Sequence, residues 1–144
     1  MTDPDDKQQI VDLTVRYCYA LDERRFEDLR SVFTPDATAD YASALCNGVG
    51  EIVDYVRSRI GHLDATQHLV ANHQVAVNGD GATCSCYLHA QHVRAGTPGG
   101  ELYMIAGRYD DTLARTADGW RITNRVLTRV WTEGNRDVVA PVPS

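Results

Sequence analysis

Two side chains have the types and the predicted positions of an acid/base pair. Asp22 follows a stripe of apolar residues at helical spacing, so its carboxylate falls on the buried face of a predicted helix. His68 begins a predicted strand. A carboxylate beside a histidine fixes the imidazole tautomer and raises its basicity, which lets the other ring nitrogen accept a proton near neutral pH. The pair therefore predicts proton-transfer chemistry.

Both residues also have a purely structural interpretation. Asp22 could turn to solvent at the helix end or pair with Arg24 or Arg25, and His68 could lie on the surface. Burying a carboxylate costs free energy unless it is paired, and this favours a partner for Asp22. Strict strand alternation places His73 on the face opposite to His68, where it is expected to pack.

Other catalytic groups are not evident in the sequence. It contains no G-x-S-x-G elbow, no G-x-G-x-x-G motif and no phosphate-binding P-loop, so neither a covalent nucleophile nor a nucleotide cofactor is expected. The Cys84 and Cys86 pair is too small a ligand set for a tetrahedral zinc site, and both are expected to be core residues. We therefore predict no cofactor and no metal.

Tyrosines and arginines are the remaining candidates. The tyrosines are either core-edge residues or donors to a developing oxyanion. Arg125 and Arg129 share one face of a predicted strand with Leu127 and Trp131, and they are either solvated or contacts for an anionic ligand. The tyrosines considered are Tyr17, Tyr41, Tyr87, Tyr103 and Tyr109.

The elements that must position these groups form an α+β pattern. Helices are predicted from near Pro4 to Asp22 and over residues 26–33 and 51–60, with a short strand at 36–41 between the last two. Tight turns then separate four long strands, which must twist and curl to pack. We expect three N-terminal helices on a strongly curved mixed or antiparallel sheet, enclosing a cone-shaped pocket. The strands are predicted at 66–77, 82–94, 101–115 and 120–132, before a tail at 135–144 that is either mobile or crosses a partner.

Composition limits the possible partners. The 144 residues suit one domain, 1–144, and carry a net charge of −6, which disfavours nucleic acid unless Arg121, Arg125 and Arg129 form a basic patch. No apolar run is long enough to span a membrane, and no signal peptide is evident, so we expect a cytoplasmic protein. The outer face of the curved sheet needs cover, which predicts a homo-oligomer, either a dimer or a trimer.

Several segments resemble the SnoaL-like, nuclear transport factor 2-like superfamily. The resemblance is carried by residues 16–22, 26–29 and 33–37 and by Asp118-Gly119-Trp120-Arg121-Ile122 near the end. Within the superfamily the chain is most similar to the scytalone dehydratase branch, which includes a bile-acid dehydratase and a dehydrochlorinase. This resemblance implies a cofactor-independent lyase acting on a small apolar cyclic substrate, such as a polyketide, aromatic or steroid-like compound.

The resemblance also implies roles for individual residues. His68 would be the catalytic base, paired with Asp22, and Tyr41 would activate a substrate carbonyl. Tyr17, Arg125 and Arg129 match pocket residues of the branch, and we expect these three residues and Tyr87 to contact the substrate.

There are also departures from the branch. Tyr87 stands near its second histidine, Tyr109 near its pocket asparagine, and Ala90 near an aspartate of the bile-acid enzyme. Tyr41 also stands near the catalytic aspartate of ketosteroid isomerases, which disfavours that base. A cyclase or isomerase using the same dyad, or a non-catalytic binding or assembly subunit, remains an alternative.

Overall fold

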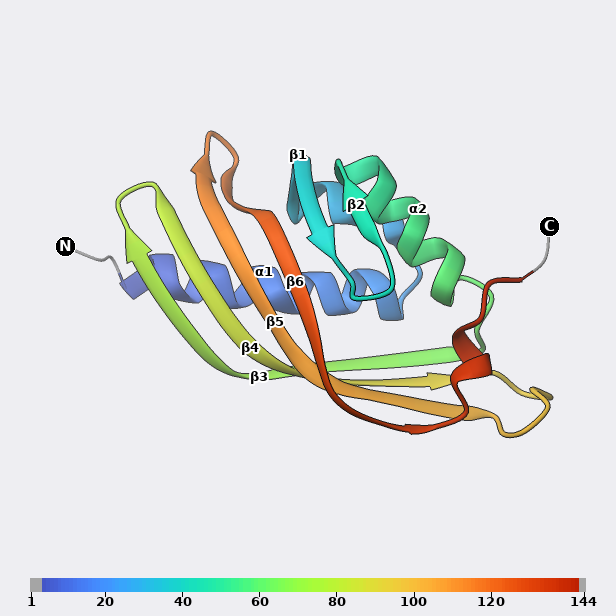
Figure 1. Cartoon of the computed structure of the whole chain (residues 1–144). Coiled ribbons are helices and arrows are strands. Elements are labelled where there is room, and N and C mark those ends of the chain that lie inside the picture. Colours follow the sequence, from blue (N-terminus) through green and yellow to red (C-terminus); the bar gives the residue numbers. More distant parts are fainter. Residues whose placement is uncertain (1–3, 143–144) are drawn as a thin grey trace.

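The computed structural model describes residues 4–142 and shows helices laid on one curved sheet (Figure 1). Its N-terminal helices are α1 (Pro4–Asp22), the 3-10 helix η1 (Phe26–Ser31) and α2 (Val49–Ile60). A second 3-10 helix, η2 (Arg136–Val139), follows the last strand. The strands are β1 (Phe33–Asp40), β2 (Leu45–Asn47), β3 (Ala65–Asn78), β4 (Gly81–Val93), β5 (Leu102–Thr116) and β6 (Gly119–Gly134).

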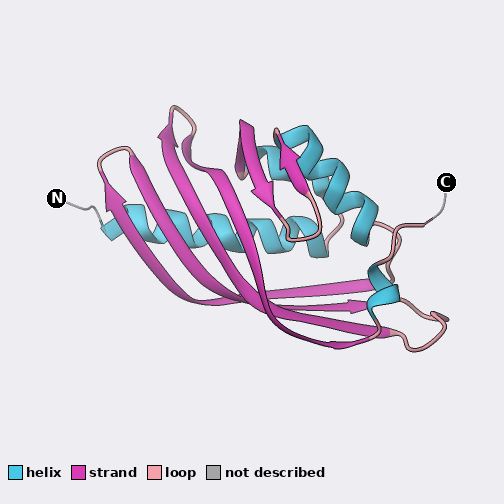
Figure 2. Ribbon diagram, in the orientation of Figure 1, coloured by secondary structure: helices cyan, strands magenta, loops and turns pink. Residues whose placement is uncertain are grey.

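The sheet has the strand order β2-β1-β6-β5-β4-β3, and only the β1–β6 pair is parallel. The four long strands bend sharply, and α1 lies along their inner side (Figures 1 and 2). α2 packs beside β1 and β2. The predicted α+β class, with N-terminal helices on a curved mixed sheet, is confirmed.

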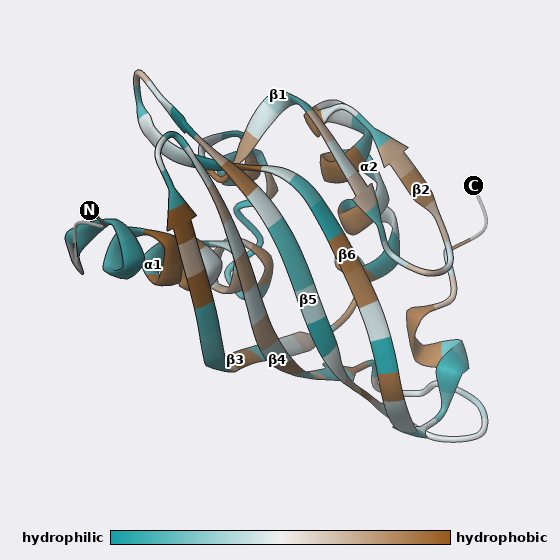
Figure 3. Ribbon diagram, turned by 60° about the vertical axis from the view of Figure 1, so that its left-hand side comes forward, coloured by the Kyte–Doolittle hydropathy of each residue, from teal (hydrophilic) through white to brown (hydrophobic). Residues whose placement is uncertain are grey.

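Local patterns explain most of these elements. Hydrophilic and hydrophobic residues alternate along the strands, because each strand buries one face (Figure 3). The turn between β3 and β4 contains Gly79 at a φ of 61°, a conformation that glycine adopts without strain. Three details differ from the prediction: β1 begins at Phe33, inside the predicted helix 26–33, β2 was not expected, and in the predicted tail residues 136–139 form η2 with Val138 and Val139 buried. Residues 143–144 of that tail lie outside the described residues.

A β-bulge changes the faces of β3. The pairing register shifts between Ala71 and Gln74, and Asn72 has a φ of 58°, which asparagine tolerates better than most residues. The extra residue brings His73 to the same side as His68, where its Nε2 lies 2.8 Å from Thr14 Oγ1 of α1. The prediction that His73 lies on the opposite face is therefore wrong.

A second bulge changes the end of β6. The register shifts between Ala106 and Gly107, whose partners are Trp131 and Arg129, so Val130 is the extra residue. Trp131 consequently turns to the outer face, where it meets His89 at 5.6 Å between ring centroids. Its predicted place on the face of Arg125, Leu127 and Arg129 is wrong, because alternation holds only between bulges.

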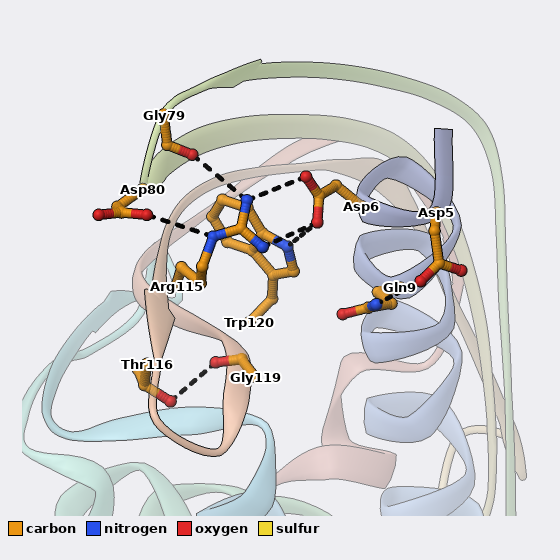
Figure 4. Close-up of polar contacts among 9 residues, drawn as sticks. All are labelled: Asp5, Asp6, Gln9, Gly79, Asp80, Arg115, Thr116, Gly119 and Trp120. Atoms are coloured by element: carbon orange, nitrogen blue, oxygen red, sulfur yellow. Dashed lines mark hydrogen bonds and ion pairs between the residues drawn. The ribbon is translucent and has the colours of Figure 1, made fainter. Parts of the chain in front are cut away.

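The first turn of α1 is tied to the far hairpins by Asp6 (Figure 4). Its carboxylate accepts two hydrogen bonds from Arg115, both 2.9 Å, and one of 3.1 Å from Trp120 Nε1. The Arg115 guanidinium lies 4.5 Å from the centre of the Trp120 ring and also contacts Asp80. These contacts fix the angle at which α1 crosses the sheet.

One hydrophobic core runs between the helices and the inner face of the sheet. Over residues 4–142, no helix is both long enough and apolar enough to cross a membrane.

Candidate active site

Asp22 and His68 form a direct hydrogen-bonded pair. The Nδ1 atom of His68 lies 2.7 Å from Oδ1 of Asp22, and the backbone amide of His68 donates to Oδ2 at 2.9 Å. The Thr66 hydroxyl donates to Oδ1 at 3.0 Å. Only 5% of the His68 side chain and 21% of the Asp22 side chain are exposed. The predicted contact between the two residues is therefore present in a largely dry environment.

Two element ends create this contact. Asp22 is the last residue of α1, and His68 is the fourth residue of β3. A carboxylate is disfavoured at a helix C-terminus, where the backbone carbonyls already carry negative charge. The three donors from β3 offset that cost. The start of β3 therefore determines where the Asp22 carboxylate lies.

The hydrogen bonds define the charge of Asp22 and the tautomer of His68. Burial alone would raise the pKa of Asp22, but the hydrogen bonds from the His68 ring and amide outweigh it and hold that pKa below its usual 3.8. An ionised carboxylate can only accept, so Nδ1 of His68 carries the hydrogen. Nε2 is then the basic nitrogen of the neutral ring.

Tyr17 and Tyr41 supply hydroxyl groups to the same cavity. Both are buried, and their hydroxyl oxygens lie 2.9 Å apart. Burial raises the pKa of each phenol above its ordinary value of 10, so both stay protonated and act as donors rather than bases. Tyr17 also shares a hydrogen bond with Tyr109. The three hydroxyl groups therefore use two hydrogens between them, and one O–H is left to donate to a further acceptor.

Arg125 lies behind the tyrosines rather than in the cavity. It is fully buried, forms two hydrogen bonds of 2.7 and 2.8 Å with Asp111, and stacks on Tyr17 and Tyr109 at 4.3 and 3.8 Å from their ring centres. Burial alone would lower its pKa, but the Asp111 carboxylate holds that pKa well above its ordinary value. The prediction that Arg125 contacts substrate is wrong, since its side chain has no exposed surface.

The cavity is enclosed by α1, α2, the curled strands and η2. It holds about 580 Å³ of empty space when the solvent at its open mouth is included. Its lining is mostly apolar and aromatic. The lining residues are Tyr17, Leu21, Tyr41, Tyr55, Val56, Arg59, Ile60, His68, Leu88, Ala90, His92, Ile105, Tyr109, Leu127, Arg129 and Val139.

The predicted pocket residues thus have different fates. His68, Tyr41, Tyr17 and Arg129 line the cavity, and Asp22 holds His68 from behind. Tyr87 is 57% exposed on the outer face of β4, so its prediction as a substrate contact is wrong. The reason is strand parity, because the neighbours Cys86 and Leu88 point inward.

Several lining residues were not singled out from the sequence. Tyr55 and Arg59 are four residues apart on α2, beside its apolar stripe. This spacing predicts that the two side chains lie on the same face of the helix. His92 is two residues after Ala90 and four after Leu88, so strand alternation predicts that all three side chains point to the same, inner face. Val139 belongs to η2, and no local sequence pattern predicts that this segment folds back onto the cavity.

His92 is a buried neutral histidine beside His68. The two rings lie 5.9 Å apart edge to face, and Nδ1 of His92 donates to the backbone oxygen of Tyr103 at 3.0 Å. Burial, followed by the neighbouring His68, lowers the pKa of His92 to about 4. His92 therefore stays uncharged at neutral pH.

Other predicted sites can be placed as well. Arg121, Arg125 and Arg129 do not form a basic surface patch, since Arg125 is buried and Arg129 lines the cavity. Cys84 and Cys86 are buried core residues, as predicted. Within residues 4–142, no cluster of three or more His, Cys, Asp or Glu side chains is arranged to hold a metal ion.

Comparison with protein families matches the SnoaL-like domain over residues 3–126. A relative from Mycobacterium tuberculosis, described as an uncharacterized protein, is 36% identical over 127 residues, which span 86% of this chain and 85% of the relative.

Solved structures show the same fold. A Kribbella flavida protein is 30% identical with a TM-score of 0.82, covering 89% of this chain and 93% of its own. A Novosphingobium aromaticivorans protein provisionally named a scytalone dehydratase has a TM-score of 0.80 at 19% identity, covering 90% of this chain and 88% of its own. At that identity the second likeness supports the fold alone. The nuclear transport factor 2-like fold also occurs in a Salmonella enterica protein at a TM-score of 0.79 and 21% identity, covering 86% of this chain and 90% of its own.

Proposed function

The chain belongs to the SnoaL-like family, and we propose that it is a dehydratase-type lyase that needs no cofactor. The observation that carries this proposal is the 2.7 Å contact between His68 Nδ1 and Asp22 inside an open, mostly apolar cavity. Such a cavity suits a small cyclic substrate that carries a hydroxyl group two carbons from a carbonyl.

The proposed reaction begins with proton removal. His68 Nε2 takes the hydrogen from the carbon next to the carbonyl, and the electron pair of that C–H bond moves into the carbonyl to form an enolate. Asp22 stabilises the resulting imidazolium because it already accepts the Nδ1 hydrogen. The O–H left over among the Tyr17, Tyr41 and Tyr109 hydroxyl groups is suited to donate to the enolate oxygen.

The second step expels water. The enolate re-forms its carbonyl, the electron pair makes the carbon–carbon double bond, and the C–O bond to the leaving hydroxyl breaks. Protonated His68 gives its hydrogen to that hydroxyl, so His68 ends the cycle neutral and water leaves. The low exposure of the His68 side chain favours this return of the same proton, because bulk water has little access to the ring.

A non-catalytic binding subunit is the rival from another class. That interpretation predicts a filled or collapsed cavity, whereas the cavity here is open. A cyclase or isomerase would use the same base, and product analysis separates it from a dehydratase.

Kinetics of the dyad variants test the proposal. Purified protein is screened against cyclic β-hydroxy carbonyl compounds by mass detection of the loss of water. We expect Asp22→Asn and His68→Gln each to lower kcat/KM by at least about a hundredfold, the usual size of an acid/base contribution. His89→Gln on the outer face and exposed Asp28→Asn serve as matched controls. Activity that survives both dyad changes would exclude this mechanism.

A further inference from the structure

Two arginines of the cavity wall have no anionic partner. Arg59 comes from α2 and Arg129 from β6, and neither forms an ion pair or hydrogen bond with another residue in the range 4–142. Arg59 meets only the face of Tyr55, at 5.7 Å. By contrast, six other arginines contact a carboxylate. These are Arg25, Arg30, Arg57, Arg108, Arg115 and Arg125.

Arg129 has an unsatisfied donor. Its Nε atom is buried and has no hydrogen-bond partner among the described residues. A buried charged donor that lacks an acceptor costs free energy, and a bound ion or ligand is one way in which such a group is completed. The Nε–H group of Arg129 is thus available to a hydrogen-bond acceptor that residues 4–142 do not provide.

The charge of the cavity points to the sign of that acceptor. Among residues 4–142 no Asp or Glu lines the cavity wall, and Asp22, which lies behind His68, already accepts hydrogen bonds from His68 and Thr66. Two permanent positive charges therefore face the cavity of a chain whose net charge is −6. With Asp22 included, one further negative charge would balance the site, which favours a monoanion.

The sheet register separates Arg129 from the base. Arg129 pairs with Gly107, Gly107 with Leu88, and Leu88 with Val70, two residues after His68 on β3. Three strand spacings of about 4.8 Å place β3 and β6 roughly 14 Å apart along the sheet. Apolar side chains fill the distance between them, including those of Leu88, Ile105 and Leu127.

We propose that the substrate is an apolar cyclic acid whose carboxylate binds Arg59 and Arg129 while its carbonyl end lies at His68. This inference rests on the proposed function and names its substrate class. A planar guanidinium matches a carboxylate with two parallel hydrogen bonds, which a neutral amide cannot reproduce. The apolar wall then holds the ring, and the two arginines determine which end enters first.

Binding of two model compounds tests the inference without requiring turnover. Naphthalene-2-carboxylate and the neutral 2-naphthamide are titrated into the whole chain by isothermal calorimetry. We expect the carboxylate to bind at least about tenfold more tightly, since charge-assisted hydrogen bonds are about twice as strong as neutral ones. Equal affinities, or no binding of the carboxylate, would overturn the inference.

Variants assign the preference to the two arginines. Arg59→Gln and Arg129→Gln together are expected to abolish the preference for the acid while leaving amide binding unchanged. Arg57→Gln is the matched control, because Arg57 lies on the same helix but pairs with Glu27 and Asp54 outside the cavity. A preference that survives the double change would contradict the inference, provided that circular dichroism shows the variant folded.

The same assay separates this inference from the proposed chemistry. His68→Gln is expected to lose turnover and to keep the preference for the acid. An intact preference without any lyase activity in the native chain would therefore refute the function and not the binding class. Lyase activity on neutral substrates, without any preference for the acid over the amide, would refute the binding class and not the function.

Discussion

At the residue scale, the dyad shows how one helix-terminal carboxylate becomes useful. Asp22 lies at the C-terminus of α1, an unfavourable place for a negative charge, and three hydrogen bonds from β3 offset that cost. One of these bonds orients the His68 ring. The interaction that allows Asp22 to be partly buried is therefore also the one that prepares the base.

Tyr41 is the residue whose hydroxyl we expect to matter most to the enolate. Tyr41→Phe removes one of the two paired hydroxyl groups, and removing one oxyanion donor typically costs about a hundredfold in kcat. Steady-state kinetics with the substrate found in the screen measure the loss. Tyr19→Phe, on the exposed side of α1, should change nothing. Full activity in Tyr41→Phe would remove the tyrosine from the mechanism.

His92 predicts a pH dependence of stability. Its pKa is about 4 in the folded chain and near 6.5 when unfolded, so the unfolded chain binds the proton more readily. Its contribution is thus present above pH 6.5 and is lost as pH falls toward 4. We expect a loss on the order of 3 kcal/mol over that window, measured by urea denaturation at several pH values.

His92→Asn tests the assignment, because the asparagine amide can replace Nδ1 as the donor to Tyr103. This variant should show a flatter pH profile, with His89→Asn as the control on the outer face. The pKa values of His62 and His73 are also lowered, so a residual slope is expected. An unchanged slope in His92→Asn would contradict the assignment.

At the element scale, α1 is held at both ends by single carboxylates. Asp22 binds β3 at one end, and Asp6 binds the β5–β6 hairpin at the other (Figure 4). Since Tyr17, Leu21 and Asp22 all lie in the last turns of α1, a change in helix angle would displace them together.

Asp6→Asn should therefore destabilise the fold. The pKa of Asp6 is lowered chiefly by its hydrogen bond with Arg115 and then by that with Trp120, so its carboxylate stabilises the fold above pH 3.8, and this contribution is lost as pH falls below that value. We expect a lower urea midpoint for Asp6→Asn at pH 7. Asp80→Asn is the control, because that side chain contacts the same arginine but is 88% exposed. Equal midpoints for the two variants would count against the role of Asp6.

At the scale of the whole molecule, the helices cover only the inner face of the sheet. A row across the outer face joins Leu69, His89, Ala106 and Trp131 on four adjacent strands, and Tyr87 lies beside it. Leu69, Tyr87 and Trp131 are about half exposed. The expected homo-oligomer stays a prediction, and this row is where a second copy would pack.

Light scattering after size exclusion tests this expectation. The native chain should elute as an oligomer, and the Leu69→Glu and Trp131→Glu double variant should elute as a monomer because it buries two charges at the contact. Leu45→Glu on β2 is the control, since Leu45 is more exposed but lies outside the row. A native monomer at all concentrations would refute the expectation.

The fold class, the turns and most element ends could be predicted from the sequence alone, whereas the residue pattern left the dyad as one of two interpretations. Helical periodicity placed Asp22 on a buried face, and alternation and turn residues located the four long strands. These patterns are local, so they can be recognised without knowledge of the tertiary contacts. The resemblance of the segments around Asp22, Tyr41 and His68 added their expected roles.

Only the tertiary structure decided which side chains enter the cavity. One extra residue at Asn72 and another at Val130 reverse the faces of β3 and β6, and strict alternation cannot anticipate a bulge. Arg125 and Arg129 share one strand face, yet only Arg125 forms an ion pair with Asp111 on the neighbouring strand. Arg129 has no such partner among the described residues and lines the cavity. That difference arises from contacts between strands, which no single segment of sequence contains.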